Sequence, residues 1–355
     1  MRTQAVTFFA IAFAAACGSS GNGGAPYDSG AADTGMADGA SPTDANGNGA
    51  DATPSTLDSG TDAAAADATG VDAAAGPGPY GSDGSNAVST FTMTVPSSKA
   101  FTVHVYLPSS GGPHPVVVLS SGLQQTAAGY ATYGQRLASW GIIAILRDDP
   151  GFLSSTSSIV DDVVYTVGTW LPAENASSSS KLHGLVDAAN IGLAGHSRGG
   201  EISLLAAEGG AHGKIKAMFG LDPVDGNSAP TAIGSIGTIG IPIAFIGETT
   251  DDGANGCAPS AQNFLALYNA ASSPAVAITA THADHTMFED PANCTFCTLC
   301  TAGTASQTDV ESAAARYLMA FFARELLGDA SVGAAFQGAG IGADVNSGRV
   351  TVVSK

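Results

Sequence analysis

Ser197 lies at the centre of the stretch Gly195 to Gly199, which has a glycine two residues to either side of the serine. The apolar run Ile191 to Ala194 before it has the pattern of a buried strand, and Glu201 to Ala207 after it has the pattern of a helix. A sharp turn between a strand and a helix holds a serine hydroxyl out at its tip, and glycines let the two elements approach closely. We therefore predict that Ser197 is a nucleophile.

A serine hydroxyl becomes a good nucleophile only when an imidazole takes its proton, and that imidazole needs an acid to hold its tautomer. Of the seven histidines, His282 and His285 come directly after the last predicted parallel strand. Functional groups gather at the carboxyl ends of parallel strands, so both are candidate bases. His196 stands next to Ser197 and cannot turn back onto it, so we expect it to pack or to form hydrogen bonds.

Candidate acids follow two other predicted strands. Asp222 ends the strand 215–221, whereas Glu248, Asp251 and Asp252 follow the strand 241–247. Both positions lie at the carboxyl edge of a parallel sheet, where an acid could reach the base. The residue pattern alone leaves the choice open.

The segments that position these residues alternate between strand and helix patterns. Two half-buried antiparallel strands are predicted first, and buried strands and helices follow. The predicted strands are 89–95, 101–107, 114–119, 141–146, one from 191, 215–221, 241–247 and 275–280. The predicted helices are 126–140, 159–171 (stopped by Pro172, with a loop at 174–181), 201–207, 259–271 and 310–327. This alternation predicts an α/β protein with a mostly parallel central sheet and helices on both faces.

The order of these elements around Ser197 resembles the α/β-hydrolase fold, and the motifs resemble two neighbouring branches of it. The stretches 195–200, 220–226 and 257–259 are similar to those of chlorophyllases. The stretches 115–122 and 136–141 are similar to bacterial cutinase-like polyester hydrolases, a branch related to dienelactone hydrolases. The resemblance covers most of residues 89–328 and implies esterase activity.

The resemblance also ranks the candidates. The chlorophyllase pattern aligns the base with His285, leaving His282 as the alternative, and it aligns the acid with Asp222. Cutinase-like enzymes place the acid after the next strand, which would select Glu248, Asp251 or Asp252. We favour Asp222, because the run 220–226 matches the chlorophyllase pattern more closely than 248–252 matches the other.

Two backbone N–H groups must stabilise the oxyanion that forms on the attacked carbonyl. We predict those of Arg198, the residue after the nucleophile, and of Leu123, in the loop after the strand 114–119. Cutinase-like enzymes carry an aromatic side chain at the position of Leu123 and a tryptophan at that of Val224. The aromatic clamp for a terephthalate-like ring is therefore missing from this chain.

The amino-terminal part predicts export. Residues 1–17 have a basic start, a short apolar core and small residues before Cys17, as in a lipoprotein signal peptide. We expect lipid anchoring at Cys17 in a bacterial cell envelope, with plain secretion as the alternative. Residues 18–84 are rich in Ala, Gly, Asp and Ser, which predicts a disordered linker, and the catalytic domain is predicted at 85–355.

The net charge bears on possible binding partners, and the cysteines bear on disulfide formation. The formal net charge is −19, and the 12 Lys and Arg residues do not cluster, which argues against nucleic-acid binding. In an oxidising compartment we expect Cys257 to form a disulfide with Cys294, Cys297 or Cys300. We expect a monomer that needs no metal or organic cofactor and meets the membrane only through its lipid anchor.

These observations predict a serine carboxylic-ester hydrolase acting on a small or lipid-like ester. Two alternatives stay open. One is a thioesterase or peptidase of the same fold. The other is a non-catalytic surface-binding lipoprotein, against which the complete set of candidates in the order Ser197, Asp222, His285 counts.

Overall fold

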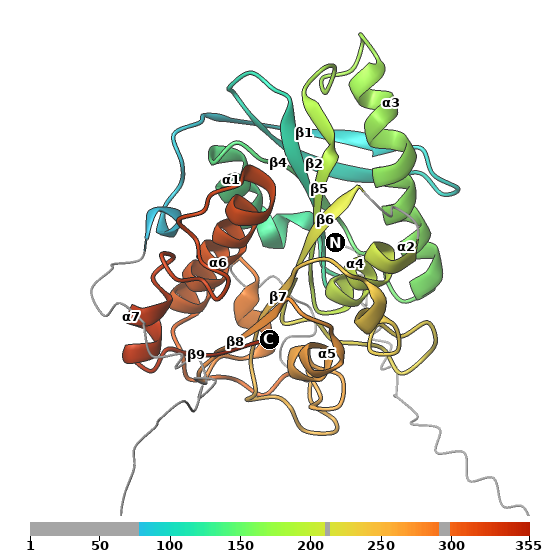
Figure 1. The fold of residues 1–355 in the computed structure, drawn as a ribbon. Coiled ribbons are helices and arrows are strands. Elements are labelled where there is room, and N and C mark those ends of the chain that lie inside the picture. Colours follow the sequence, from blue (N-terminus) through green and yellow to red (C-terminus); the bar gives the residue numbers. More distant parts are fainter. Residues whose placement is uncertain (1–77, 210–213, 291–298) are drawn as a thin grey trace, which may run out of the picture. The chain divides into compact units, whose positions relative to one another are not determined.

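The computed structural model describes residues 78–209, 214–290 and 299–355, in which nine strands form one mixed sheet. Their spatial order is β1-β2-β4-β3-β5-β6-β7-β8-β9 (Figure 1). The strands are β1 (Val88–Val95), β2 (Phe101–Pro108), β3 (His114–Ser120), β4 (Ile143–Arg147), β5 (Val186–His196), β6 (Ile215–Leu221), β7 (Ile243–Gly247), β8 (Ala275–Ala280) and β9 (Val350–Ser354).

The middle of the sheet, from β4 through β3 and β5 to β8, is parallel, and antiparallel strands lie at both edges. All the parallel strands therefore end at one edge, where the elbow, the Asp222 turn and the His285 loop meet. The α/β-hydrolase prediction is confirmed in this architecture.

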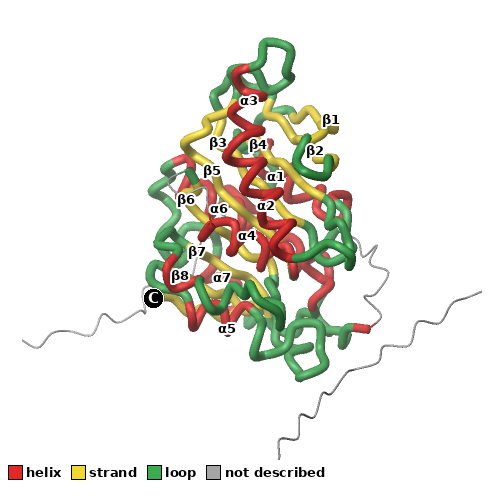
Figure 2. Tube along the Cα trace, turned by 90° about the vertical axis from the view of Figure 1, so that its right-hand side faces the viewer, coloured by secondary structure: helices red, strands yellow, loops and turns green. Residues whose placement is uncertain are grey.

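Helices cover both faces of the sheet because the inner strands are apolar on both sides. Along β3, Val117 and Leu119 join one core cluster, whereas Val116 and Val118 join the other. The helices are α1 (Ala131–Ser139), α2 (Thr156–Tyr165), α3 (Leu171–Ala176), α4 (Arg198–Gly209), α5 (Phe264–Ala270), α6 (Gln307–Leu327) and α7 (Ile341–Asn346). Residues of α1 and α6 belong to the first cluster, and residues of α2, α4 and α5 belong to the second. In the figures α1 and α6 lie on one side of the sheet, and α2 and α4 lie on the other (Figures 1 and 2).

Several predicted helices begin or end elsewhere. The predicted end at Pro172 is wrong, because a π-helical turn, Thr166–Trp170, joins α2 to α3, which runs on to Ala176. Pro172 lies in the first turn of α3, where a missing N–H is tolerated. Part of the predicted loop 174–181 is therefore helical. The patterns also did not predict α7 or β9, which pairs antiparallel with β8 and closes that edge.

Residues 78–84, which the sequence pattern assigns to the linker, pack against the α/β part of the chain. A short 3₁₀ turn, Pro79–Gly81, buries the Tyr80 ring against Trp140, with 4.7 Å between the ring centroids. Asp83 forms an ion pair of 2.9 Å with Arg136. The Tyr80 ring and these polar contacts together hold the segment against the domain.

The predicted signal peptide and most of the predicted linker, residues 1–77, lie outside the described residues. Among the described helices, none combines the length and the apolar character needed to cross a bilayer.

Candidate active site

Ser197 lies at the turn between β5 and α4, with a backbone φ of 51°. A non-glycine residue rarely adopts this left-handed conformation, and here the packing of strand against helix imposes it. A β-carbon on Gly195 would lie 2.1 Å from the Gly199 carbonyl oxygen, and one on Gly199 would lie 2.1 Å from that of Ser120. Both glycines are therefore required for the chain to turn at this point.

The structure brings the predicted serine, histidine and acid into one line. Ser197 Oγ lies 2.9 Å from His285 Nε2, and His285 Nδ1 lies 2.7 Å from Asp222 Oδ2. Asp222 is fully buried directly after β6, and its other oxygen accepts the Glu248 N–H at 3.1 Å. His285 begins a short 3₁₀ turn, whose preceding residue Asp284 accepts the Thr286 N–H.

Electrostatics around His285 favour its protonated form. Burial by itself lowers the pKa of His285, but the hydrogen bond and charge of Asp222, together with Glu248 and Glu289, outweigh it and raise the pKa above its ordinary value. Burial raises the pKa of Asp222, and the bond to His285 opposes that rise. An imidazole in this setting is a strong base toward the Ser197 hydroxyl.

The loop after β3 passes against the elbow, as the predicted position of Leu123 requires. A β-carbon on Gly122 would lie 3.4 Å from Ser197 Cβ. Leu123, the next residue, is half-exposed. Arg198 is the first residue of α4, so its N–H has no acceptor within the helix. Arg198 thus adjoins the serine in the chain, and Leu123 follows a residue that packs against it.

His196 connects the elbow to the loops on either side. Its Nε2 lies 3.0 Å from the His285 carbonyl oxygen, so this nitrogen must carry the proton. Its Nδ1 then accepts from the Tyr130 hydroxyl at 2.8 Å, and the Tyr130 oxygen in turn accepts the Gly122 N–H at 3.1 Å. Burial holds the pKa of His196 well below its ordinary value, so the ring is neutral. The expectation that His196 forms hydrogen bonds agrees with this arrangement.

A chlorophyllase family model matches residues 78–338 of the chain. The chain belongs to the chlorophyllase family. This family lies within the α/β-hydrolase superfamily, which confirms the predicted resemblance and makes the protein a hydrolase. No curated protein matches the chain significantly in sequence.

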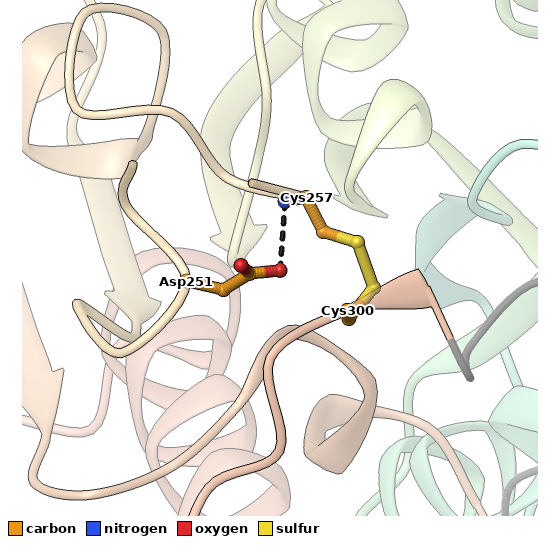
Figure 3. Close-up of side chains that lie close together, drawn as sticks. All are labelled: Asp251, Cys257 and Cys300. Atoms are coloured by element: carbon orange, nitrogen blue, oxygen red, sulfur yellow. Dashed lines mark hydrogen bonds between the residues drawn. A yellow bond between two sulfur atoms is a disulfide. The ribbon is translucent and has the colours of Figure 1, made fainter. Parts of the chain in front are cut away.

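The alternative base and two of the alternative acids of this chlorophyllase-family chain have other contacts. His282 is exposed, and its carbonyl accepts the N–H groups of Thr304 and Ala305, each at 2.9 Å. Asp251 is buried and its Oδ2 accepts the Cys257 N–H at 2.7 Å (Figure 3). Asp252 is half-exposed. None of these three is the side chain that contacts His285 Nδ1.

The structure pairs Cys257 with Cys300, with 5.4 Å between their Cα atoms (Figure 3). Cys294 and Cys297, the other predicted partners, lie outside the described residues. The disulfide joins the loop after β7 to the segment that follows the His285 turn. Beyond Cys300, the Gly303 N–H donates to Asp284 at 2.8 Å, which further ties that segment to the base loop.

Two sets of described side chains bring possible metal ligands within 4.8 Å of one another. They are Asp251 with Cys257 and Cys300, and Asp222 with Glu248 and His285. In the first, the sulfurs are bonded to each other, and a metal would need thiolates. In the second, the His285 nitrogen and the Asp222 oxygen already share a short hydrogen bond. We assign a metal to neither set.

Sequence reasoning missed Tyr130 and Glu289 as parts of the site. Glu289 is 2% exposed, and its Oε1 lies 3.5 Å from His196 Nδ1. Burial raises the pKa of Glu289 to about 7. The lone pair of His196 Nδ1 already accepts from Tyr130, so a neutral carboxyl can lie beside this nitrogen without a proton on it. Nothing in the local pattern marks Tyr130, and the chlorophyllase-like pattern after His285 includes Glu289 without giving it a role. Both roles depend on contacts across the fold.

Proposed function

We propose that this hydrolase is a serine carboxylic-ester hydrolase that acts through Ser197, His285 and Asp222. The observation that carries the proposal is the unbroken pair of hydrogen bonds, 2.9 Å from Ser197 Oγ to His285 and 2.7 Å from His285 to Asp222. The strained position of Ser197 at the elbow supports the same reading, since such strain clusters at functional sites.

In the proposed mechanism Ser197 Oγ attacks the ester carbonyl while its proton passes to His285 Nε2. The N–H groups of Leu123 and Arg198 stabilise the resulting oxyanion, and Asp222 stabilises the imidazolium. His285 then gives the proton to the leaving alcohol, which leaves an acyl group on Ser197. Water, activated by the same imidazole, releases the acid and restores the serine.

A fluorophosphonate probe tests the nucleophile, because it phosphonylates activated serines. We expect one label on the folded domain, and we expect Ser197→Ala to abolish both labelling and ester hydrolysis. Ser312→Ala, which alters an exposed serine on α6, is the matched control and should change neither. Labelling that survives Ser197→Ala would overturn the assignment, and an unlabelled wild type would favour the non-catalytic alternative.

For the substrate we propose an ester with an aliphatic, lipid-like part. The Val224 N–H donates to the Ser197 carbonyl at 3.1 Å, and Leu123 follows Gly122, which packs against the serine, so two aliphatic residues belong to the segments next to Ser197. Leu153 is fully exposed on the loop after β4, beside the exposed ring of Phe152. The Arg198 guanidinium holds this loop next to the elbow by donating to the Ser154 carbonyl at 2.6 Å.

Acyl-chain length tests this proposal. Leu153→Ser should raise KM for p-nitrophenyl octanoate by roughly threefold to tenfold, about the loss expected when a partly buried aliphatic contact is removed, and should leave p-nitrophenyl acetate unchanged. Val353→Ser, which alters an exposed apolar residue on β9, is the control. Equal effects on both esters would contradict the proposed contact. Hydrolysis rates measured on thioester and peptide substrates test whether the protein is instead a thioesterase or a peptidase.

We also propose export and lipid anchoring at Cys17, on the sequence pattern alone. An alkyne-tagged fatty acid should label the full chain in cells, and Cys17→Ser should remove the label. A label that persists would point to another attachment site.

A further inference from the structure

A second carboxylate lies beside the candidate acid and base. Glu248 follows β7, is fully buried, and has a carboxylate oxygen within 4.8 Å of both the Asp222 carboxylate and a ring nitrogen of His285. Because β6 and β7 are parallel neighbours, the residues that end them are brought to the same point. The backbone of Glu248 also contributes, since its N–H donates to Asp222 Oδ1.

Within the part of the chain that the structure describes, one of the two Glu248 oxygens has a hydrogen-bond partner and the other has none. Oε2 accepts the N–H groups of Thr250 and Asp251, the latter at 2.9 Å, and so holds the turn after β7. Oε1 is buried and accepts no hydrogen bond from any described residue. A buried polar atom without a partner is costly, so its presence beside the reacting histidine calls for an explanation other than folding.

The turn that carries Glu248 is fixed from outside. Asp251, whose N–H bonds to Glu248, accepts the Cys257 N–H through its own carboxylate, and Cys257 is bonded to Cys300 (Figure 3). The position of Glu248 relative to His285 is therefore held by a chain of short contacts that ends at a covalent bond.

We propose that Glu248 is a positioning residue of the catalytic centre, a second carboxylate whose charge stabilises the His285 imidazolium that forms when Ser197 attacks. The inference rests on the proposed function and deepens it. Asp222 holds the Nδ1–H and sets the tautomer, and Glu248 adds charge without a direct bond. Two backbone N–H groups donate to Oε2, but Oε1 accepts from no donor of the described residues, so part of the carboxylate charge stays available to the imidazolium.

The surrounding charges determine when this contribution is present. Among the described residues, the titratable groups next to His285 and Glu248 include Asp222, Asp251, His196, Glu289 and Asp284, which caps the turn that His285 begins. Burial, followed by the charge of Asp222, raises the pKa of Glu248 to about 7. Glu248 is thus a neutral acid below that pH and an anion above it, so its contribution to catalysis grows as the pH rises through about 7.

Glu248→Gln tests the proposal, because the amide oxygen can still accept from Thr250 and Asp251 while the charge is lost. We expect kcat/KM for p-nitrophenyl butyrate to match the wild type at about pH 5.5 and to fall roughly threefold to tenfold below it at about pH 8.5. The matched control is Glu201→Gln. Glu201 is equally buried with a pKa raised to about 7 by burial, but its carboxylate accepts the Gly226 N–H instead of facing His285.

A ratio of wild type to Glu248→Gln that stays constant over this pH range would overturn the proposal, since a purely structural role lowers activity equally at every pH. A rising ratio in Glu201→Gln would overturn it as well. If Glu248→Gln does not fold, the downfield proton on His285 Nδ1 of the wild type provides the second measurement. We expect the chemical shift of this proton to report a second ionisation near pH 7. If Glu248 is the group that ionises, Glu289→Gln must show the same ionisation. Its loss in Glu289→Gln would count against Glu248.

The proposed function has its own test, so the two can fail separately. If Ser197→Ala abolishes fluorophosphonate labelling and Glu248→Gln shows no pH-dependent loss, the esterase mechanism stands and the role of Glu248 does not. If labelling survives Ser197→Ala, the mechanism fails whatever Glu248 does.

Discussion

The two sides of His285 are built from similar parts that do different things. On one side, Asp222 and Glu248 face the imidazole nitrogen, and on the other, His196 and Tyr130 hold the backbone. We call these the acid side and the scaffold side. Each contains a buried glutamate, Glu248 or Glu289, whose pKa burial raises to about 7 and which has one carboxylate oxygen without a partner among the described residues.

The difference lies in what each side contacts. The acid side acts on the charge of the ring, through a hydrogen bond of 2.7 Å to Nδ1. The scaffold side acts on the position of the ring, through neutral hydrogen bonds that link the Gly122 loop, the elbow and the His285 carbonyl. Burial and a raised pKa therefore do not identify a functional carboxylate unless its neighbours are also considered.

The largest expected effect is on the acid side. Asp222→Asn should leave the fold intact and lower kcat by roughly 10³- to 10⁴-fold, because the amide favours the wrong tautomer of His285. Steady-state kinetics on a short-chain ester measure it. Asp252→Asn, which alters a half-exposed carboxylate in the loop after β7, should stay within about twofold, as surface substitutions away from special features usually do. The opposite ranking would move the orienting acid to that loop.

A smaller loss is expected on the scaffold side. Tyr130→Phe removes the donor to His196 and the acceptor of the Gly122 N–H, so we expect about tenfold lower kcat/KM and roughly 1–3 kcal/mol less stability. The acidic limb of the pH profile should not move, because no charge is removed. Tyr317→Phe is the control: this buried hydroxyl on α6 contacts Arg316 and Asp344, and its loss should cost stability but not activity. A shifted pH limb in Tyr130→Phe would break the distinction between the two sides.

Local patterns predicted the elements that build both sides, and the predicted strand 275–280 has the same bounds as β8. The elbow and the end of β6 could be located because glycine spacing and apolar runs are local properties. Local patterns alone do not distinguish Asp222 from Glu248 as the acid, since each residue directly follows one of two neighbouring strands. In the structure both approach His285, and only one bonds to it.

Long-range contacts account for the features of the fold and the site that the sequence did not predict. Tyr130 belongs to the site through a hydrogen bond to His196, 66 residues away in the sequence. Tyr80 packs against Trp140 and donates a hydrogen bond to Asp329, neither of which is near it in the chain. Pro172 predicts a helix end, because the sequence pattern does not reveal the π-helical turn before it. Propensity describes each segment alone, and tertiary packing overrides it.

The smallest effect on activity is expected from Glu289→Gln, which tests whether the scaffold side influences the charge of His285. Glu289 stays protonated in the folded protein up to about pH 7, whereas in the unfolded chain it ionises near its ordinary value of 4.5. Its contribution to stability is therefore fully present below about pH 4.5 and is lost as the pH rises through about 7, by roughly 3 kcal/mol. Glutamine does not ionise, so the variant should keep that stability.

Urea unfolding at several pH values between about 4.5 and 8 measures this directly. We expect the free energy of unfolding to fall less steeply with pH in Glu289→Gln than in the wild type, while kcat/KM changes by less than about twofold. Glu289 also raises the pKa of His285, after Asp222 and Glu248, so the acidic limb should move down less than in Glu248→Gln. A larger shift of that limb than in Glu248→Gln would show that the scaffold side also controls the charge of the base, and the two sides would then act as one network around His285.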